Sequence, residues 1–155
     1  MSAFLDFFDG RQVGWRDGRP IWLTLTRLRW RRRDGRVVLI PEEFYTDLAS
    51  VPRVPFAYWI AGGRGIRSSL SHDFAYQFGY YLLEDGSRLL VDRPEADEDF
   101  RVSLIDDPIS GAGRAMAATM YGAVRTGGGF VWRRRSERTP RLNPIWASSW
   151  GIQAA

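Results

Sequence analysis

The sequence predicts an α+β domain, in which an antiparallel β-hairpin sheet from the N-terminal half packs against about three helices from the C-terminal half. Two hairpin signals lie before residue 41, apolar residues follow a helical spacing after residue 67, and the last part of the chain has little periodicity. We therefore expect one α+β domain over residues 1–129 and an extended C-terminal arm over residues 130–155.

The hairpin signals combine alternating apolar residues with Asp-Gly turns. A short strand is predicted over residues 12–15, before a turn at Asp17-Gly18. Residues 21–31 alternate with period two and are rich in β formers, which predicts one continuous strand. Asp34-Gly35 then joins this strand to a second one over residues 37–40, because Asp-Gly favours the tight turns of hairpins.

The helical signals dominate the second half. The spacing of Leu70, Phe74 and Phe78 predicts a first helix over residues 67–82. A short strand is predicted over residues 88–91, and a second helix runs from residue 93 to about 105 with Pro94 in its first turn. A third helix is predicted from about residue 110 to 125, where Gly127-Gly128-Gly129 would end it.

The composition limits the chemistry. The chain has 155 residues, of which 45% are hydrophobic, enough to fill a core. The absence of cysteine excludes disulfides, thiolate nucleophiles and cysteine-based zinc sites, and a single histidine excludes sites that need two imidazoles. A metal ion would therefore be held mainly by oxygen atoms, which favours calcium or magnesium over zinc.

The charge is modest, at a formal net +4, and all 22 basic residues are arginine. Arginine pairs with carboxylates in a bidentate manner and stacks on aromatic rings, so it suits stable interfaces. The basic runs are short, and we do not expect nucleic-acid binding. No apolar run reaches the roughly 18–20 residues of a membrane-spanning helix, and the acidic N-terminus differs from a signal peptide, so neither is expected.

The best candidate for chemistry is His72 on the first predicted helix. Tyr76 lies four residues later on the same face, whereas Asp73 points about 100° away and would flank the same cleft as a ligand. If the first two helices pack antiparallel, Asp97 reaches one imidazole nitrogen and raises the basicity of the other. The predicted catalytic residues are therefore His72, Asp97 and Tyr76.

Asp47 is the second acidic candidate. Its apolar neighbours Phe44 and Leu48 predict a loop held against the core, where a carboxylate needs backbone amides, an arginine or a metal ion. Asp47 and Asp73 are the predicted metal ligands, for a hard ion such as calcium or magnesium.

Each of these residues also has a structural interpretation that the spacing leaves open. His72 would then be a buried histidine that bonds a carboxylate only to satisfy both groups. Asp47 would form an Asx turn or a helix cap, and Tyr76 would pack in the core with its hydroxyl at the rim.

The predicted arm combines aromatic anchors with arginines, a composition typical of protein interfaces. An arm packed on its own domain is the alternative. The predicted interface residues are Trp132, Arg133, Arg134, Arg135, Trp146 and Trp150.

Four short blocks follow one another along the chain: Phe44-x-Thr46-Asp47-Leu48-Ala49-Ser50-Val51-Pro52, His72-Asp73-x-x-Tyr76, Glu95-Ala96-Asp97-x-x-Phe100 and Met120-Tyr121-x-x-Val124-Arg125. Over about residues 41–132 they resemble a family of phage and prophage proteins of unknown function. The resemblance implies a virion-associated protein of the tail or tail tip, with a structural or assembly role. Its arm would contact other phage structural proteins, and it would reside in the virion, or in the host cytoplasm before assembly.

The blocks His72-Asp73-x-x-Tyr76 and Ala96-Asp97 also resemble phospholipase A2. This resemblance implies that His72 activates water, that Asp73 binds calcium and that Asp97 supports the histidine. Carbonyls of a glycine loop at residues 62–65 would complete the shell of the ion, whereas the disulfides of the secreted enzymes have no counterpart here. The alternative function is therefore a phage hydrolase that acts on lipid or cell wall, with His72 as the general base.

Overall fold

The structure is a computed structural model that describes the backbone of residues 1–16, 19–46 and 65–136. Side chains are described for these residues except 16, 19, 20, 130, 131 and 133–136. The predicted turn at Asp17-Gly18, the candidate ligand Asp47 and the glycines at 62 and 63 therefore lie outside the described residues, as do Trp146 and Trp150 of the predicted arm.

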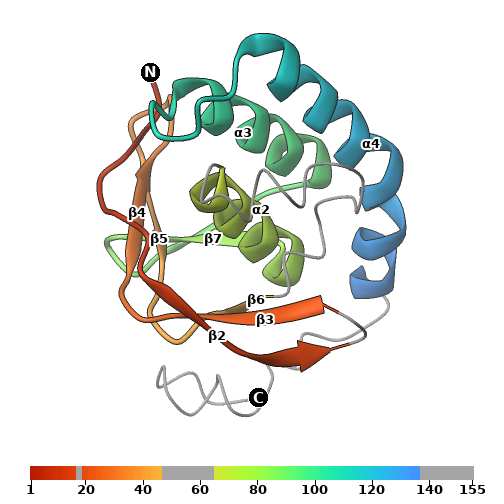
Figure 1. Ribbon diagram of the computed structural model, residues 1–155. Helices are drawn as coiled ribbons and strands as arrows, with labels where there is room; N and C mark the ends of the chain where they lie inside the picture. The colour runs from red at the N-terminus through yellow and green to blue at the C-terminus, as the bar shows by residue number, and fades with distance from the viewer. Residues whose placement is uncertain (17–18, 47–64, 137–155) are drawn as a thin grey trace.

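Two antiparallel sheets come mainly from the N-terminal half and three described helices from the C-terminal half, which confirms the α+β class. One sheet has five strands in the order β1-β4-β5-β7-β8, and the other has three in the order β2-β3-β6. Figure 1 shows the sheets on two sides of the molecule. The strands are β1 (Ala3–Phe4), β2 (Gly10–Arg16), β3 (Arg19–Thr24), β4 (Leu28–Arg31), β5 (Val37–Ile40), β6 (Tyr45–Thr46), β7 (Tyr80–Leu83) and β8 (Arg88–Leu90).

The predicted hairpin at Asp34-Gly35 is confirmed. Strands β4 and β5 pair from Leu28↔Ile40 to Arg31↔Val37, and Gly35 adopts a φ of +90°, which favours glycine. Alternation along these strands directs Trp30, Val38 and Ile40 into the core, where all three are fully buried.

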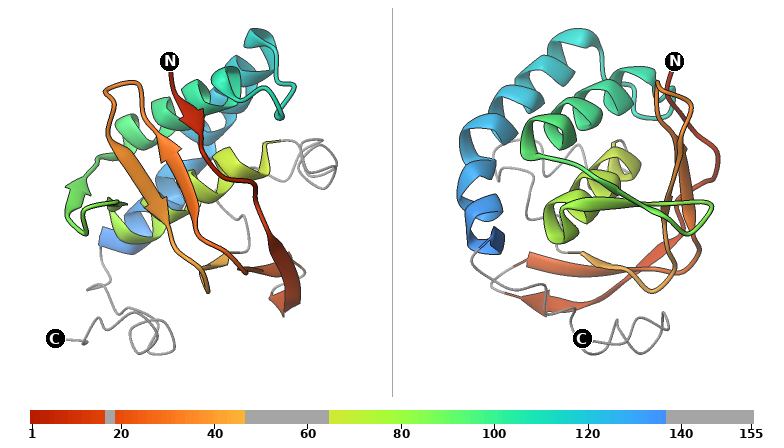
Figure 2. Two further views of the ribbon diagram at one scale, coloured as in Figure 1. Left: turned by 90° about the vertical axis from the view of Figure 1, so that its left-hand side faces the viewer. Right: turned by 180° about the vertical axis from the view of Figure 1, so that it is seen from behind.

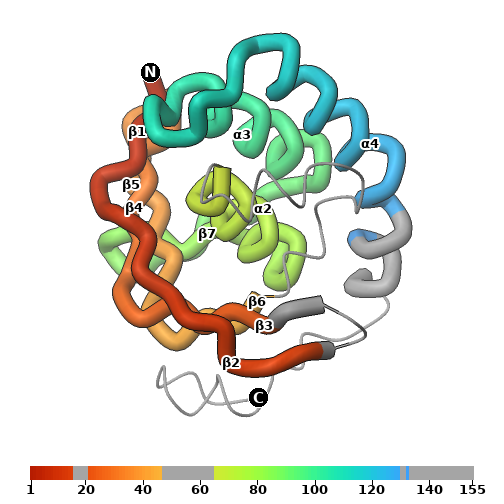
Figure 3. The backbone as a smooth tube through the Cα atoms, viewed as in Figure 1, coloured from red at the N-terminus to blue at the C-terminus, as the bar shows by residue number. Residues whose placement is uncertain are grey.

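The single strand predicted over residues 21–31 is wrong, because the chain leaves one sheet at Thr24 and enters the other at Leu28 (Figure 3). The Thr24 hydroxyl donates to the carbonyl of Pro41 and accepts from the amide of Phe44, which holds the bend. Leu25, which the alternation would bury, is 42% exposed at this bend.

The first helix is shorter than predicted. Helix α2 (Ile66–Phe78) ends at Gly79, whose φ of +69° lets its amide donate to the carbonyl of Ala75. The following Tyr80–Leu83 is β7, which pairs with β5 and β8, whereas the helical prediction continued to residue 82. Helix α3 (Arg93–Asp106) begins as predicted, with the Asp92 carboxylate accepting from the amide of Glu95.

The third helix does not stop at its glycines. Helix α4 (Arg114–Ser136) starts later than predicted and runs through Gly127, Gly128 and Gly129, so the first residues of the predicted arm are helical. A Cβ atom at Gly128 would overlap the Tyr76 hydroxyl, and one at Gly129 would lie 2.7 Å from Nη1 of Arg93. These two glycines therefore allow α4 to approach its neighbours closely, and they do not end the helix.

Helix α2 lies at the centre of the molecule, between the two sheets and the pair α3 and α4 (Figures 1 and 2). Every residue from Ile66 to Tyr76 is buried. One apolar cluster joins α2 to the five-stranded sheet, and a second joins α3 to α4. A helix buried on all sides is normally apolar throughout, so the polar residues of α2 need an explanation.

Candidate functional site

Helix α2 buries six polar residues within one short stretch, and they are Arg67, Ser68, Ser69, Ser71, His72 and Asp73. Burial of polar groups is unfavourable unless they find hydrogen-bond partners. Arg67 pairs with Asp107 and donates to the carbonyl of Asp6, and the hydroxyls of Ser69 and Ser71 donate to helix carbonyls. The buried hydroxyl of Ser68 has no hydrogen-bond partner among the described residues. His72 and Asp73 use partners on different sides of the helix.

His72 bonds Asp97 of α3, as predicted. Its Nε2 lies 2.9 Å from Oδ1 of Asp97, and both side chains are fully buried. The Tyr76 hydroxyl, one turn further along α2, donates to the same oxygen at 2.6 Å. The structure therefore brings the three predicted catalytic residues together around one carboxylate oxygen.

The other oxygen of Asp97 faces two arginines. Nη1 of Arg125, from α4, donates to Oδ2 at 3.1 Å, and Nε of Arg93, one turn before Asp97 on α3, lies 3.6 Å from it. Nε of Arg93 also donates to the Tyr76 hydroxyl at 3.3 Å. Asp97 is thus held from three helices, and its position depends on all of them.

This network determines the protonation states of Asp97 and His72. Burial acts to raise the pKa of Asp97, but the hydrogen bonds from His72 and Tyr76 outweigh it, so the pKa lies below its ordinary value and Asp97 is ionised. Burial lowers the pKa of His72, although Asp97 opposes this, so the ring is neutral at pH 7. A neutral ring that faces a carboxylate carries its proton on Nε2, which leaves a lone pair on Nδ1.

Nδ1 of His72 is buried, and it has no hydrogen-bond partner among the residues that the structure describes. The rings of Tyr76 and Phe100 lie against the imidazole, with centroids 4.2 Å and 4.8 Å from it. Most buried polar atoms in folded proteins have a partner, so an isolated one requires a reason.

Asp73 points away from this network, as the helical spacing predicts. It is 3% exposed and accepts a hydrogen bond from the hydroxyl of Thr46, on β6 of the three-stranded sheet. Within residues 1–16, 19–46 and 65–136, no three histidine or acidic side chains cluster as metal ligands would. The role of Asp73 as a calcium ligand stays a prediction, as does that of Asp47, which lies outside the described residues.

Of the predicted interface residues, Trp132 alone has a described side chain. It packs edge-on against Tyr76, with ring centroids 5.1 Å apart at 78°. Trp132 therefore contacts its own domain, next to the Asp97 network. The backbone of Arg133, Arg134 and Arg135 continues α4, and their side chains are not described.

Arg93 and Arg125 have no predicted role, and Thr46 is predicted only as a candidate turn cap, whereas the structure places all three in the networks of Asp97 and Asp73. The spacing of Arg93 and Asp97, four residues apart on a predicted helix, was the available signal for the first. Arg125 and Thr46 occur in the blocks quoted above, but nothing in their spacing indicates Asp97 or Asp73 as partners.

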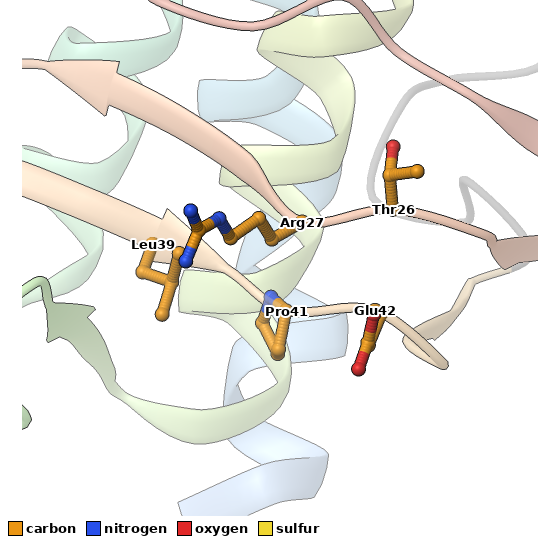
Figure 4. Close-up of a pocket in the computed structure, with 5 residues that line it drawn as sticks. All are labelled: Thr26, Arg27, Leu39, Pro41 and Glu42. Carbon is orange, nitrogen blue, oxygen red and sulfur yellow. The ribbon is translucent and has the colours of Figure 1, made fainter.

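A surface hollow of about 460 Å³ lies elsewhere, lined by Thr26, Arg27, Leu39, Pro41 and Glu42 (Figure 4). Leu39 alternates along β5 with the buried Val38 and Ile40, so it points to the outer face of the sheet. The hollow is therefore separate from the His72 network, which lies on the inner side.

A family model described as a protein of unknown function, DUF1353, matches residues 22–124. This range contains His72, Asp73, Tyr76 and Asp97, together with Thr46 and Arg93. No curated protein and no solved structure matches the chain. In the described part of the chain, no helix combines the length and the apolar character needed to cross a membrane.

Proposed function

We propose that this chain, which belongs to the DUF1353 family of proteins of unknown function, is a hydrolase that uses His72 as its general base. The observation that carries the proposal is that Nδ1 of His72, whose other ring nitrogen bonds Asp97, has no hydrogen-bond partner among the described residues. A histidine that serves only to satisfy a buried carboxylate would be expected to pair its second nitrogen as well. A general base needs an unpaired lone pair on one nitrogen and an orienting carboxylate on the other.

In the proposed reaction, Nδ1 of His72 accepts a proton from a water molecule while the water oxygen attacks an ester or amide carbonyl. The carbon–oxygen bond to water forms, and the tetrahedral intermediate then expels the alcohol or amine, which takes the proton back from His72. Asp97 stabilises the imidazolium during the reaction without being protonated. Tyr76 and Arg125 support this role, because their hydrogen bonds hold Asp97 ionised and oriented.

No step is assigned to a metal ion. Calcium takes six to eight oxygen ligands. Of the described carboxylates next to His72, that of Asp97 is held by His72, Tyr76 and Arg125, and that of Asp73 already accepts from Thr46. The resemblance to phospholipase A2 favours a cation beside Asp73, and the matching test is whether calcium changes the activity of the wild type more than that of Asp73→Asn.

The proposal requires that water reach a ring with no exposed surface. Diethyl pyrocarbonate tests this directly, because it modifies neutral imidazole and the chain has one histidine. We expect modification of the folded protein at a measurable rate, with loss of activity in step. A folded protein whose ring never reacts, while the unfolded chain reacts at once, would show a histidine that is closed to substrate.

The decisive experiment compares the wild type with His72→Gln on ester substrates, from short-chain esters to phospholipid vesicles. We expect hydrolysis by the wild type and a loss of at least about a hundredfold in the variant, the usual contribution of a general base. Circular dichroism and a urea titration serve as the control for folding. A folded His72→Gln variant with unchanged activity would contradict the proposal.

The virion-associated role is the second candidate, and it is compatible with the first. It is supported by the sequence of the C-terminal segment, in which Trp146 and Trp150 accompany a run of arginines. Mass spectrometry of purified particles is the test, and absence of the protein from them would rule this role out.

A further inference from the structure

Two buried polar atoms of helix α2 have no hydrogen-bond partner among the described residues. They are the hydroxyl oxygen of Ser68 and Nδ1 of His72, and neither side chain has any exposed surface. Ser68 and His72 are four residues apart on α2, so they lie on one face of the helix with their Cβ atoms about 5–6 Å apart. The two unpaired atoms are therefore neighbours.

The orientation of the ring brings Nδ1 to the side of Ser68. A helical side chain leans towards the N-terminus of its helix, so that of His72 leans over the turn that contains Ser68. Nε2 of the ring points to α3, which lies beside α2, and bonds Asp97 there (Figures 1 and 2). Nδ1 is the ring nitrogen nearer to the backbone, so it stays close to α2 itself.

The neighbouring serines show that the unpaired hydroxyl of Ser68 is not a general property of this helix. Serine within a helix often bonds back to a carbonyl one turn earlier. The hydroxyl of Ser69 donates to the carbonyl of Gly65 at 3.1 Å, and that of Ser71 donates to the carbonyl of Ser68 at 2.9 Å. Ser69 is also within one turn of His72, but its hydroxyl is already used. Ser68 is thus the serine of α2 whose hydroxyl is left for His72.

Ser68 also lies at a helix end that can stabilise negative charge. It is the third residue of α2, and the cap residue Gly65 makes no side-chain hydrogen bond to this end. The amides of the first helical turn have no acceptor within the helix, and they carry the positive end of its dipole. Such amides can stabilise the oxyanion that forms when a nucleophile attacks a carbonyl group.

We propose that Ser68 is the nucleophile of the hydrolase and forms a Ser-His-Asp triad with His72 and Asp97. This inference rests on the proposed function, in which His72 is the base. The hydroxyl of Ser68 gives its proton to Nδ1 of His72, and its oxygen forms a bond to the carbonyl carbon of a carboxylic ester. The bond from this carbon to the alcohol oxygen then breaks, and the alcohol leaves with the proton from Nδ1.

The water attack described under the proposed function is then the second half of the reaction. Water gives its proton to Nδ1 of His72 and attacks the ester that Ser68 now carries. The tetrahedral intermediate expels the oxygen of Ser68, which takes the proton back, and the carboxylic acid is released. The reaction thus passes through an acyl-enzyme on Ser68, which direct attack of water on the substrate does not form.

A fluorophosphonate probe tests the nucleophile without the natural substrate, because it reacts with activated serine hydroxyls. We expect the folded full-length protein to be labelled at Ser68, as located by mass spectrometry, and the label to be absent from Ser68→Ala and from the unfolded chain. His72→Gln should slow the labelling by at least about a hundredfold. Ser69→Ala is the matched control, because its hydroxyl is held by the carbonyl of Gly65, and it should be labelled like the wild type.

A thiol at the same position gives a second readout. The chain has no cysteine, so Ser68→Cys introduces a single thiol. If His72 accepts a proton from this position, iodoacetamide should modify the thiol at pH 7 on the order of tenfold faster than in S68C/H72Q or in Ser69→Cys. Equal rates in the three proteins would show that His72 does not activate this position.

Hydrolysis of p-nitrophenyl acetate separates this proposal from the proposed function. We expect Ser68→Ala to lose at least about a thousandfold in rate, as the loss of a covalent nucleophile does. Wild-type rates in Ser68→Ala, with an inactive His72→Gln, would overturn the nucleophile and leave direct attack of water in place. An active His72→Gln would remove the base and the triad together. Absence of label on Ser68 in the folded protein would also overturn the nucleophile.

Discussion

Gly128 lies directly against the hydroxyl of Tyr76, at a distance that leaves no room for a Cβ atom. The hydroxyl donates to Asp97, which also bonds His72. A glycine in the middle of a helix is normally unfavourable relative to alanine. At this position the glycine lowers the stability of the helix, but it allows α4 to approach the Asp97 network closely.

Gly128→Ala should therefore displace the Tyr76 hydroxyl and destabilise the protein by about 1–3 kcal/mol, as overpacking does. Gly127→Ala is the control, because no atom lies within 4 Å of a Cβ atom there and the residue is exposed. The control should gain about 0.5–1 kcal/mol from its helix propensity. Urea unfolding measures both, and equal stabilities for the two variants would contradict the close contact.

A double-mutant cycle makes this test sharper. Tyr76→Phe removes the hydroxyl that a Cβ atom at residue 128 would meet, so the cost of Gly128→Ala should shrink in that background. If Gly128→Ala lowered the free energy of unfolding equally in both backgrounds, its effect would not come from contact with the Tyr76 hydroxyl.

Asp97→Asn should be among the most destabilising substitutions in the chain. It keeps the shape of the side chain but removes the negative charge that faces Arg93 and Arg125, and breaking a buried charge pair costs about 3 kcal/mol or more. Glu98→Gln is the control, because its pair with Arg101 is exposed and such changes stay within about 0.5 kcal/mol. Similar unfolding midpoints for the two variants would mean that the network contributes little to stability.

The single histidine gives an unambiguous pH signal. Burial lowers the pKa of His72 in the folded protein below its ordinary value of 6.5. Below pH 6.5 the unfolded chain therefore takes up a proton that the folded protein does not, so this residue makes stability fall as the pH falls. Proton NMR of the one imidazole should show no titration near pH 6.5, and a midpoint at or above 6.5 would contradict the burial effect.

Asp99 should act in the opposite direction. Burial raises the pKa of Asp99 to about 6, although Arg32, at 3.0 Å, opposes the rise. The carboxylates of Glu95 and Asp34, which also pair with Arg32, raise the pKa further by repulsion. Between pH 3.8 and 6 the folded protein holds a proton that the unfolded chain has lost, so stability from this residue rises as the pH falls through this range.

The measurement is the difference in unfolding free energy between the wild type and Asp99→Asn from pH 7 to pH 4. We expect the difference to shift in favour of the wild type at low pH by on the order of 2 kcal/mol. A difference that stays constant with pH would show that Asp99 titrates normally.

The sequence predicts the parts of this structure that depend on local signals. The turn at Gly35, the start of α3 at Arg93 with Pro94 in its first turn, and the meeting of His72 with Asp97 follow from residue type and spacing, and all are confirmed. Alternation within residues 21–31 does not reveal that its two halves belong to different sheets, because Thr24 bends the chain through contacts with residues about twenty positions away.

The glycines of the helices also show where prediction from the local sequence fails. Gly127 to Gly129 resemble a helix end, yet the helix continues through them, and at Gly128 and Gly129 the side chains of Tyr76 and Arg93 occupy the space that a Cβ atom would fill. Gly79 does end a helix, but the Tyr80 to Leu83 stretch that follows looks apolar enough to continue it. Gly79 has a φ of +69°, whereas Gly128 and Gly129 are helical and lie against side chains of other helices, and the local sequence specifies neither difference.

Gly79→Ala tests the glycine that does end a helix. Gly79 has a φ of +69°, and no atom lies within 4 Å of a Cβ atom there, so any cost comes from the backbone alone. An L-residue in this conformation costs roughly 1–2 kcal/mol. Gly122→Ala, at an exposed helical glycine that is equally free of contacts, should instead stabilise the protein. Opposite shifts in the urea midpoint are expected, and a stabilised Gly79→Ala would mean that α2 runs on into β7 in solution.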